Sequence, residues 1–288
     1  MSRGRPKARL VALTVLALWL VGCAAAEPTA PYSTAAPAGS RPPSAGSVAP
    51  PAKSGPRWAP SPGSTWQWQL SGPLDLSVSA QVYDVDLFGT SAEEVRGLHA
   101  LGRHVICYLN AGSYEPNRPD SGNYPAVLLG RPLDGWPDER WLDISRLDLL
   151  EPLIAARMDL CAAKGFDGVE PDNVDGFSND TGFPLTAAEQ GLFNTRVAEL
   201  AHRRGLAVGL KNDLDQVSDL QPAFDFAVNE QCVQYDECAS LSSFIRAGKA
   251  VFHVEYELSP ARFCPVTGPL GFSSMKKELG LNAARWPC

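Results

Sequence analysis

Residues 165–176 read GFDGVEPDNVDG, and the interpretation of the whole chain depends on this segment. It begins as a short apolar strand and ends with carboxylates at Glu170, Asp172 and Asp175. Because side chains alternate along a strand, Glu170 and Asp172 point to the same face, about 6.6 Å apart along the backbone. The alternative interpretation is a solvated loop with an Asx turn at Asp172 and Asn173. The neighbouring segments favour a functional strand end.

A single local pattern recurs along the chain. A helical segment ends in glycine, which suits the left-handed position past a helix C-terminus, and a short apolar run follows that finishes in polar residues. Strands alternating with helices imply a parallel sheet with right-handed crossovers. About seven or eight such units in roughly 225 residues predict a (β/α)8 barrel of the TIM type. The segments are residues 66–70, 80–87, 102–110, 165–173, 205–213, 224–231 and 248–257.

Two details qualify the predicted barrel. A doubly wound open sheet is the alternative, but no glycine-rich phosphate loop follows the first strand. We expect an irregular last unit, because residues 271–274 are a poor strand sequence.

Three helix starts match a capping box: Ser91 with Glu94, Ser145 with Asp148, and Thr186 with Glu189.

The first 63 residues are predicted to lie outside the folded domain. Residues 1–23 have a basic leader and an apolar run of secretory length, and they end in a sequence that resembles a lipobox, with Cys23 as the lipidated residue. An ordinary signal peptide is the alternative. Residues 24–63 are rich in Ala, Pro, Ser and Gly and predict a disordered linker. Residues 64–288 are the predicted (β/α)8 domain of an exported protein, which is either anchored at the cell surface or secreted.

Charge and cysteine content agree with an exported, acidic domain. Removing residues 1–22, which carry four basic residues and no acid, takes the formal net charge from −7 to −11. Such a domain is a poor candidate for binding nucleic acid and a reasonable one for a cationic ligand. We expect a monomer. Besides Cys23, six cysteines remain, and an even number in an exported chain suggests disulfides.

The cysteine spacing suggests a pairing but does not settle it. Cys232 with Cys238 is the most local pair, and Cys264 with Cys288 would hold the C-terminal tail. Cys107 and Cys161 then form either a bridge or two buried thiols. No metal site is predicted, because the chain has no CxxC motif and its four histidines are scattered.

Polar residues gather at the C-terminal ends of the predicted strands. In a barrel these ends converge on the face where active sites lie, so six strands together predict an acidic pocket. The residues at the strand ends are Asp84, Asp86, Asn110, Glu170, Asp172, Asp175, Lys211, Asn212, Asp213, Asn229, Glu230, Glu255 and Glu257.

The chemistry of this pocket points to glycoside hydrolysis. One carboxylic acid can protonate the leaving oxygen while a second carboxylate attacks the anomeric carbon or activates water. Crowded acids raise one another's pKa, which supplies a general acid at neutral pH. A serine or cysteine triad lacks a well-placed histidine. A metal-dependent phosphodiesterase is the third possibility, with Glu170, Asp172 and Asp175 as Ca²⁺ or Mg²⁺ ligands. Phosphate substrates normally call for several basic residues, however, and the predicted pocket offers Lys211 alone.

Residues 66–264 resemble the endo-α-1,4-polygalactosaminidase family of glycoside hydrolases (family 114). The resemblance rests on residues 82–86 (VYDVD), 165–175, 209–213 (GLKND) and 229–232 (NEQC). It implies a (β/α)8 barrel that cleaves α-1,4-linked galactosamine polymers within the chain and needs no cofactor. It also implies that Asp172 and Glu230 are the catalytic pair. Glu170 is the first replacement if either fails.

The cationic amino-sugar polysaccharide implied by this resemblance fits an acidic groove. Candidates for holding its ammonium groups are Glu170, Asp86, Asp213 and Glu255, each of which has a supporting role as the alternative. Tyr83 and Tyr108 are the preferred sugar-contacting aromatics. The predicted substrate-binding set is completed by Asp84, Asn173, Asp175, Lys211 and Asn212. A surface lipoprotein that binds such a polysaccharide without cutting it is the alternative function.

Overall fold

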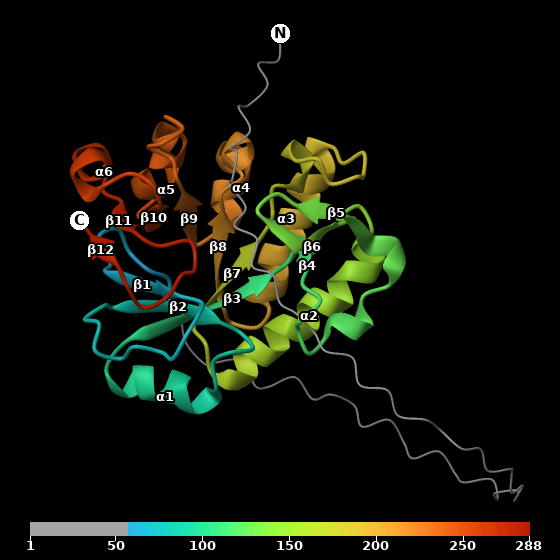
Figure 1. The fold of residues 1–288 in the computed structure, drawn as a ribbon, viewed down its shortest axis with the longest axis horizontal. Helices are drawn as coiled ribbons and strands as arrows, with labels where there is room; N and C mark the ends of the chain where they lie inside the picture. Colours follow the sequence, from blue (N-terminus) through green and yellow to red (C-terminus); the bar gives the residue numbers. More distant parts are fainter. Residues whose placement is uncertain (1–56) are drawn as a thin grey trace, which may run out of the picture. The chain divides into compact units, whose positions relative to one another are not determined.

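The computed structural model of the chain describes residues 57–288 (Figure 1). The predicted signal peptide, Cys23 and most of the linker lie outside the described residues. Among residues 57–288, no helix is long and apolar enough to cross a membrane. Residues 57–63, predicted as the end of the linker, instead contact the domain. Arg57 forms an ion pair with Asp225 at 2.9 Å, and Trp58 stacks on His104 with 4.3 Å between ring centroids.

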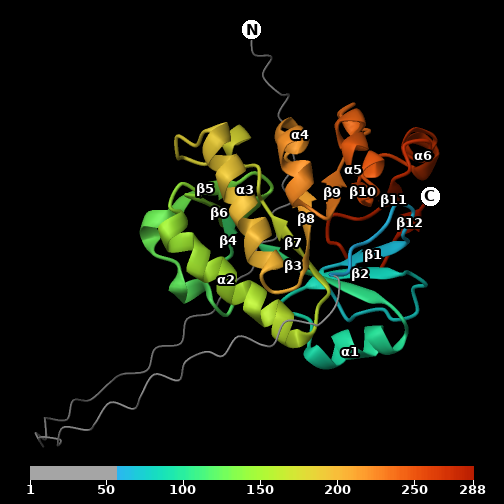
Figure 2. The ribbon, with the colours of Figure 1, turned by 180° about the vertical axis from the view of Figure 1, so that it is seen from behind.

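Eight parallel strands follow one another around a curved sheet, as predicted for a (β/α)8 barrel (Figures 1 and 2). The first and eighth strands meet through side-chain and loop contacts. The Trp66 indole donates to the Ser273 carbonyl at 2.9 Å, and the Leu281 carbonyl accepts from the Leu70 amide at 2.9 Å. The strands are β1 (Trp66–Gln69), β2 (Val82–Asp86), β3 (His104–Asn110), β7 (Gly168–Asp172), β8 (Ala207–Lys211), β9 (Phe226–Glu230), β10 (Val251–Glu255) and β11 (Ser273–Lys276).

Helices lie along the outer side of this sheet (Figure 2). The loop from β1 to β2 contains no helix, and β11 continues directly into a C-terminal segment. The irregular last unit is therefore present, although its strand begins at Ser273 rather than at residue 271. The helices are α1 (Ala92–Ala100), α2 (Leu147–Lys164), α3 (Ala187–His202), α4 (Val217–Leu220), α5 (Ser242–Arg246) and α6 (Pro260–Thr267).

Two short additions to the barrel were not foreseen from the sequence. A three-stranded antiparallel sheet is inserted between β3 and α2, in the order β4 (Ser113–Tyr114), β6 (Trp136–Leu142) and β5 (Leu129–Leu133). A last strand, β12 (Trp286–Pro287), pairs antiparallel with β11. Both additions lie next to the C-terminal strand ends and so extend the face where the polar residues gather.

Because side chains alternate between the two faces of each strand, the buried apolar residues form two separate cores. One cluster fills the barrel interior and includes Trp66, Val82, Phe226 and Phe252, while a larger one lies between the sheet and the helices. Because Val82 points inward, Tyr83 points outward and Asp84 inward again. The same parity in the other strands decides which strand-end residues reach the site.

The cysteines and helix caps test three further predictions. All six remaining cysteines are paired as suggested: Cys107–Cys161, Cys232–Cys238 and Cys264–Cys288. The capping boxes that begin at Ser91 and Thr186 are present.

The capping box predicted at Ser145 is wrong. The Ser145 hydroxyl donates to the Asp143 carboxylate at 2.6 Å, and α2 begins one residue later, after Arg146. The nearer acid therefore captures the hydroxyl that would have capped the helix.

Candidate active site

Lys211, the last residue of β8, places its ammonium group among three carboxylates. Its Nζ lies 3.1 Å from Glu170, 2.9 Å from Asp172 and 3.4 Å from Glu230, and 4.7 Å from the ring centroid of Trp68. Burial alone would lower the pKa of Lys211, but the carboxylates raise it well above its ordinary value. The lysine is therefore a fixed positive charge at the centre of the site.

Asp172 ends β7 and is held as an ionised carboxylate. Its Oδ1 contacts Lys211, and its Oδ2 accepts a hydrogen bond from the Tyr108 hydroxyl at 2.7 Å. Burial would raise the pKa of Asp172, yet the charge of Lys211 and the hydrogen bonds from Lys211 and Tyr108 bring it below its ordinary value. The side chain remains 18% exposed. Asp172 therefore combines a negative charge with access to a substrate.

Glu230 ends β9 and faces the same ammonium group from the other side. Its Oε1 accepts from the Tyr256 hydroxyl, and its Oε2 accepts from the Asn212 side chain at 3.1 Å. The Asn212 oxygen also accepts from the Glu230 amide at 2.9 Å, which fixes the strand end. Glu230 is 25% exposed. Since both carboxylates contact one nitrogen, at 2.9 and 3.4 Å, those two oxygens lie at most about 6.3 Å apart, below the separation of about 6.5–9.5 Å between the carboxyl groups of inverting glycosidases.

Glu170 and Asp84 lie deeper and do not reach the surface. Both side chains are fully buried, because each stands two residues before the last inward position of its strand. Burial, the largest cause, raises the pKa of both, and each carboxyl group interacts with the other. Protonation of one of the two, which the raised pKa values favour, would reduce the cost of burying two acids. Their depth and the ion pair of Glu170 with Lys211 suit support for the lysine, while the catalytic role of Glu170 and the binding role of Asp84 stay predictions.

Asp86 and the inserted sheet form one edge of the site. Asp86 accepts from the amides of Phe88 and Gly89 and forms an ion pair with Arg118 at 2.7 Å. Arg118 also contacts Glu115 at 2.6 Å. Asp86 is thus occupied by an arginine, which leaves it little capacity for a substrate ammonium group.

Glu139 of β6 is a half-buried carboxyl group at this edge. Its Oε2 accepts from Ser113 at 2.9 Å and from Asn110 at 3.2 Å. Burial raises the pKa of Glu139 to about 7, opposed by the Ser113 hydrogen bond and assisted by Glu115 and Asp172. Sequence reasoning missed Glu139, Glu115 and Arg118, because they come from a loop insertion with no barrel pattern.

The loops that follow the acidic strands have left-handed backbones. Positive φ angles occur at Asn173 (58°), Asn212 (48°), Asp213 (47°) and Gln231 (63°). Asn and Asp tolerate this region better than most residues, and such conformations cluster at functional sites. Gly112 permits the close approach of one loop, since a Cβ there would lie 1.7 Å from the Asn173 carbonyl oxygen.

The Asn173 side chain therefore faces the protein. It donates to Asn110 at 3.1 Å and to Ser113 at 3.3 Å, so it holds the loop after Asp172 against the neighbouring strand.

Asp175 and Asp213 form a second, partly neutral acidic pair beside the site. Burial and Asp172 raise the pKa of Asp175 to about 6, and burial and Asp175 raise that of Asp213 to about 7. Asn194 of α3 donates to Asp213 at 2.8 Å and to the Val174 carbonyl at 2.9 Å, and it is fully buried. A mid-helix asparagine is ordinarily a surface residue, so the burial of Asn194 was not expected from the sequence.

Two predicted binding residues point away from the site. The Tyr83 hydroxyl donates to the carbonyls of Asp75 and Val78 on the outer side of the sheet, at 3.0 and 2.7 Å. Glu255 is fully buried and accepts from the Val233 amide and from His253. Both side chains face outward for the same reason: each residue is one position out of register with the inward-facing set.

The charged centre is not suited to a metal ion. Lys211 already occupies the position between Glu170, Asp172 and Glu230 that a cation would take. Within residues 57–288, the grouping with metal-ligand spacing is Cys232, Cys238 and His253, but the two cysteines share a disulfide and have no thiolate to offer.

Comparisons with known proteins place these features in a family. The model of glycoside-hydrolase family GH114 matches residues 47–288. A protein of Deinococcus radiodurans is 31% identical over 281 residues, which cover 85% of this chain and 87% of that protein. The crystal structure of Aspergillus fumigatus Ega3 in complex with galactosamine is 39% identical, with a TM-score of 0.78, and the match covers 81% of this chain and 98% of Ega3. The glycoside hydrolase domain of PelA from Pseudomonas aeruginosa shares the fold at 12% identity, with a TM-score of 0.57 over 77% of this chain and 96% of that domain.

Proposed function

We propose, from the premise that the chain belongs to glycoside hydrolase family GH114, that it cleaves α-1,4-linked galactosamine polymers at internal bonds. The observation that carries the proposal is the pair of accessible carboxylates, Asp172 and Glu230, on either side of the Lys211 ammonium group. Two carboxyl groups at this spacing can cleave a glycosidic bond without a cofactor.

The proposed division of roles starts from the charge state of Asp172. Asp172 has a lowered pKa and is ionised, which suits a nucleophile that attacks the anomeric carbon. Glu230 then donates a proton to the leaving oxygen as the glycosidic bond breaks. In the second step Glu230 takes a proton from water, and the water oxygen attacks the anomeric carbon and releases Asp172. Tyr108 and Tyr256 hold one oxygen of each carboxyl group in place during both steps.

The choice of an amino sugar as substrate rests on the net charge of the chain and on its similarity to Ega3. Ega3 was solved with galactosamine, and the present chain has a formal net charge of −7. Galactosamine carries an ammonium group at C2, which an acidic surface attracts. The export and lipid anchoring predicted from Cys23 belong to this proposal, together with a monomeric enzyme. The three disulfides support an oxidising compartment.

The test is hydrolysis of de-N-acetylated polygalactosamine, measured as the release of reducing ends. We expect Asp172→Asn and Glu230→Gln each to lower the rate about 10²–10⁴-fold while the thermal unfolding midpoint stays near that of the wild type. Asp219→Asn, an exposed change on α4, is the matched control. The assignment is wrong if both active-site variants keep wild-type rates.

The same assay separates the other functions. Binding of the polymer without shorter products would favour a non-catalytic polysaccharide-binding protein. Loss of activity in EDTA would favour a metal-dependent enzyme, whereas the Lys211-centred site predicts no effect.

A further inference from the structure

Two amide side chains of α3, Gln190 and Asn194, are fully buried. They stand one helical turn apart, so they lie on the same face of α3, which packs against β7 and β8 (Figure 2). Burial of an amide costs free energy unless its donors and its acceptor are hydrogen-bonded, and an apolar residue would avoid that cost. The partners of the two amides therefore indicate what they do in this helix.

The hydrogen bonds of Asn194 end in two different loops. Its Nδ2 donates to the Val174 carbonyl at 2.9 Å and to the Asp213 carboxyl group at 2.8 Å, which uses both hydrogens of the amide nitrogen. Its Oδ1 accepts from the Gln190 side chain at 2.9 Å, and Gln190 in turn accepts from the Phe177 amide at 3.2 Å. Asn194 therefore joins the loop after β7 to the loop after β8.

Each of these loops adjoins one member of the catalytic pair. The loop after β7 begins directly after Asp172, and Val174 is its second residue. In the loop after β8, Asp213 follows Asn212, whose side chain donates to Glu230 at 3.1 Å and accepts from the Glu230 amide at 2.9 Å. A chain of hydrogen bonds thus runs from the backbone beside one catalytic carboxyl group to the side chain that orients the other.

The segments that Asn194 joins have strained backbones. Asn173, Asn212 and Asp213 have φ angles of 58°, 48° and 47°, in the left-handed region. Residues other than glycine stay in this region only where the surrounding structure holds them there. Asn194 bonds to the residue that follows Asn173 and to Asp213 itself. Among residues 57–288, no other side chain donates to the Asp213 carboxyl group, whose Oδ1 is buried without a partner.

We propose that Asn194 is a positioning residue that fixes the separation of the Asp172 and Glu230 carboxyl groups. The inference rests on the proposed function. Asn194 is fully buried and acts through the two loops, whereas Lys211 contacts both carboxyl groups directly. Retaining glycosidases need their carboxyl groups about 5–5.5 Å apart. A displacement of about 1 Å in a catalytic group can lower the rate about 10²-fold.

The experiment replaces Asn194 with leucine and measures kcat and KM separately on de-N-acetylated polygalactosamine. Leucine has nearly the same size and no hydrogen-bonding atom, so the change breaks the link between the loops and keeps the volume. We expect kcat to fall about 10–100-fold and KM to change by less than about 2-fold, because no substrate contact is removed. Circular dichroism establishes a temperature at which the variant is folded.

Leu200→Ala is the matched control for a loss of stability. Leu200 is buried in the same helix, so the change leaves a cavity but breaks no side-chain hydrogen bond. Each variant is assayed at the same interval below its own unfolding midpoint. We expect kcat of Leu200→Ala to stay within about 2-fold of the wild-type value. A wild-type kcat in folded Asn194→Leu, or an equal fall in Leu200→Ala, would overturn the inference.

Gln190→Met is the milder variant and decides the question if Asn194→Leu does not fold. It removes the hydrogen bond that orients the Asn194 amide and the bond to the Phe177 amide. We expect kcat to fall about 3–10-fold with KM unchanged, and an unchanged kcat would overturn the inference. A wild-type enzyme that does not cut the polymer contradicts the proposed function and this inference with it, whereas an active enzyme with unaffected variants contradicts the positioning role alone.

Discussion

Replacing Lys211 with methionine tests whether one ammonium group holds the catalytic site together. Methionine has a similar length and is apolar, so the change removes the charge and keeps most of the volume. Three carboxylates then lose their common partner, of which Glu170 is fully buried and Asp172 is 18% exposed. Removal of one member of a buried ion pair costs about 3–5 kcal/mol, which is a large part of the stability of an ordinary domain.

The direction of the pH dependence follows from the pKa of Asp172. In the wild type this pKa lies below its ordinary value, so the ion pair with Lys211 contributes stability above the ordinary pKa and loses it as the pH falls through the folded-state value. Without Lys211, burial dominates and the pKa of Asp172 rises above the ordinary value. The variant is then destabilised as the pH increases. The difference in stability between wild type and Lys211→Met should therefore grow from pH 4 to pH 8.

The assays are urea unfolding across this pH range and hydrolysis of polygalactosamine. We expect a rate about 100-fold lower at pH 7, because part of Asp172 becomes protonated and the carboxylates repel one another. The double variant Lys211→Met/Glu170→Gln removes one acid together with the lysine and should recover part of the lost stability. Wild-type stability at pH 8 in Lys211→Met would refute the assignment of Lys211 as the common counter-ion.

Three further results are expected. Tyr83→Phe should cost about 1 kcal/mol of unfolding free energy and leave KM unchanged, because the lost hydroxyl bonds to backbone carbonyls; a raised KM would restore Tyr83 as a substrate contact. Asp213→Asn should raise the melting temperature more at pH 8 than at pH 5. The raised pKa of Asp213, about 7, means that the wild type loses stability as the pH rises from about 4 to 7, by at most ~4 kcal/mol. NMR of the first product should show the α anomer, since the oxygens of Asp172 and Glu230 that contact Lys211 lie at most about 6.3 Å apart; the β anomer would indicate inversion.

The sequence predicted the barrel well because its evidence is local. Each strand carries an apolar run and a polar end, and the alternation of side chains decides which of those ends face inward. Asp172, Lys211 and Glu230 stand at such inward ends, and all three meet in the structure. Tyr83 and Glu255 show the limit of this reasoning. They lie within the same motifs but one residue out of phase, and a strict count from the inward apolar residues would have separated them.

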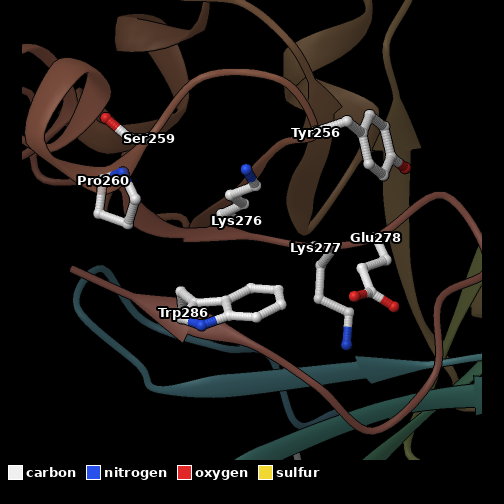
Figure 3. Close-up of a pocket in the computed structure, with 7 residues that line it drawn as sticks. All are labelled: Tyr256, Ser259, Pro260, Lys276, Lys277, Glu278 and Trp286. Carbon is white, nitrogen blue, oxygen red and sulfur yellow. The ribbon is translucent and has the colours of Figure 1, made fainter.

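The parts that the sequence did not predict depend on contacts between distant segments. Glu139 and Arg118 belong to an inserted sheet whose position over the barrel follows from tertiary packing. Asn194 lies in mid-helix and looks like a surface residue, and its burial becomes visible only when its partner Asp213 is known. Trp286 lines a pocket with Tyr256 (Figure 3) because β12 pairs with β11 near the disulfide of the C-terminal tail.

The position of Lys211 also changes how substrate recognition is understood. Because its ammonium group already contacts the deep carboxylates, a sugar ammonium gains little from them and would be repelled by the lysine at short range. Selection of the charged sugar therefore falls to carboxylates farther from Lys211. Asp86 and Glu115 already form ion pairs with Arg118. Glu139, in contrast, is half-buried and accepts hydrogen bonds through one oxygen only. With a pKa raised to about 7, Glu139 would gain most from a neighbouring cation, since the cation would favour its charged form. We therefore predict that recognition of the amino group depends on the inserted sheet rather than on the barrel.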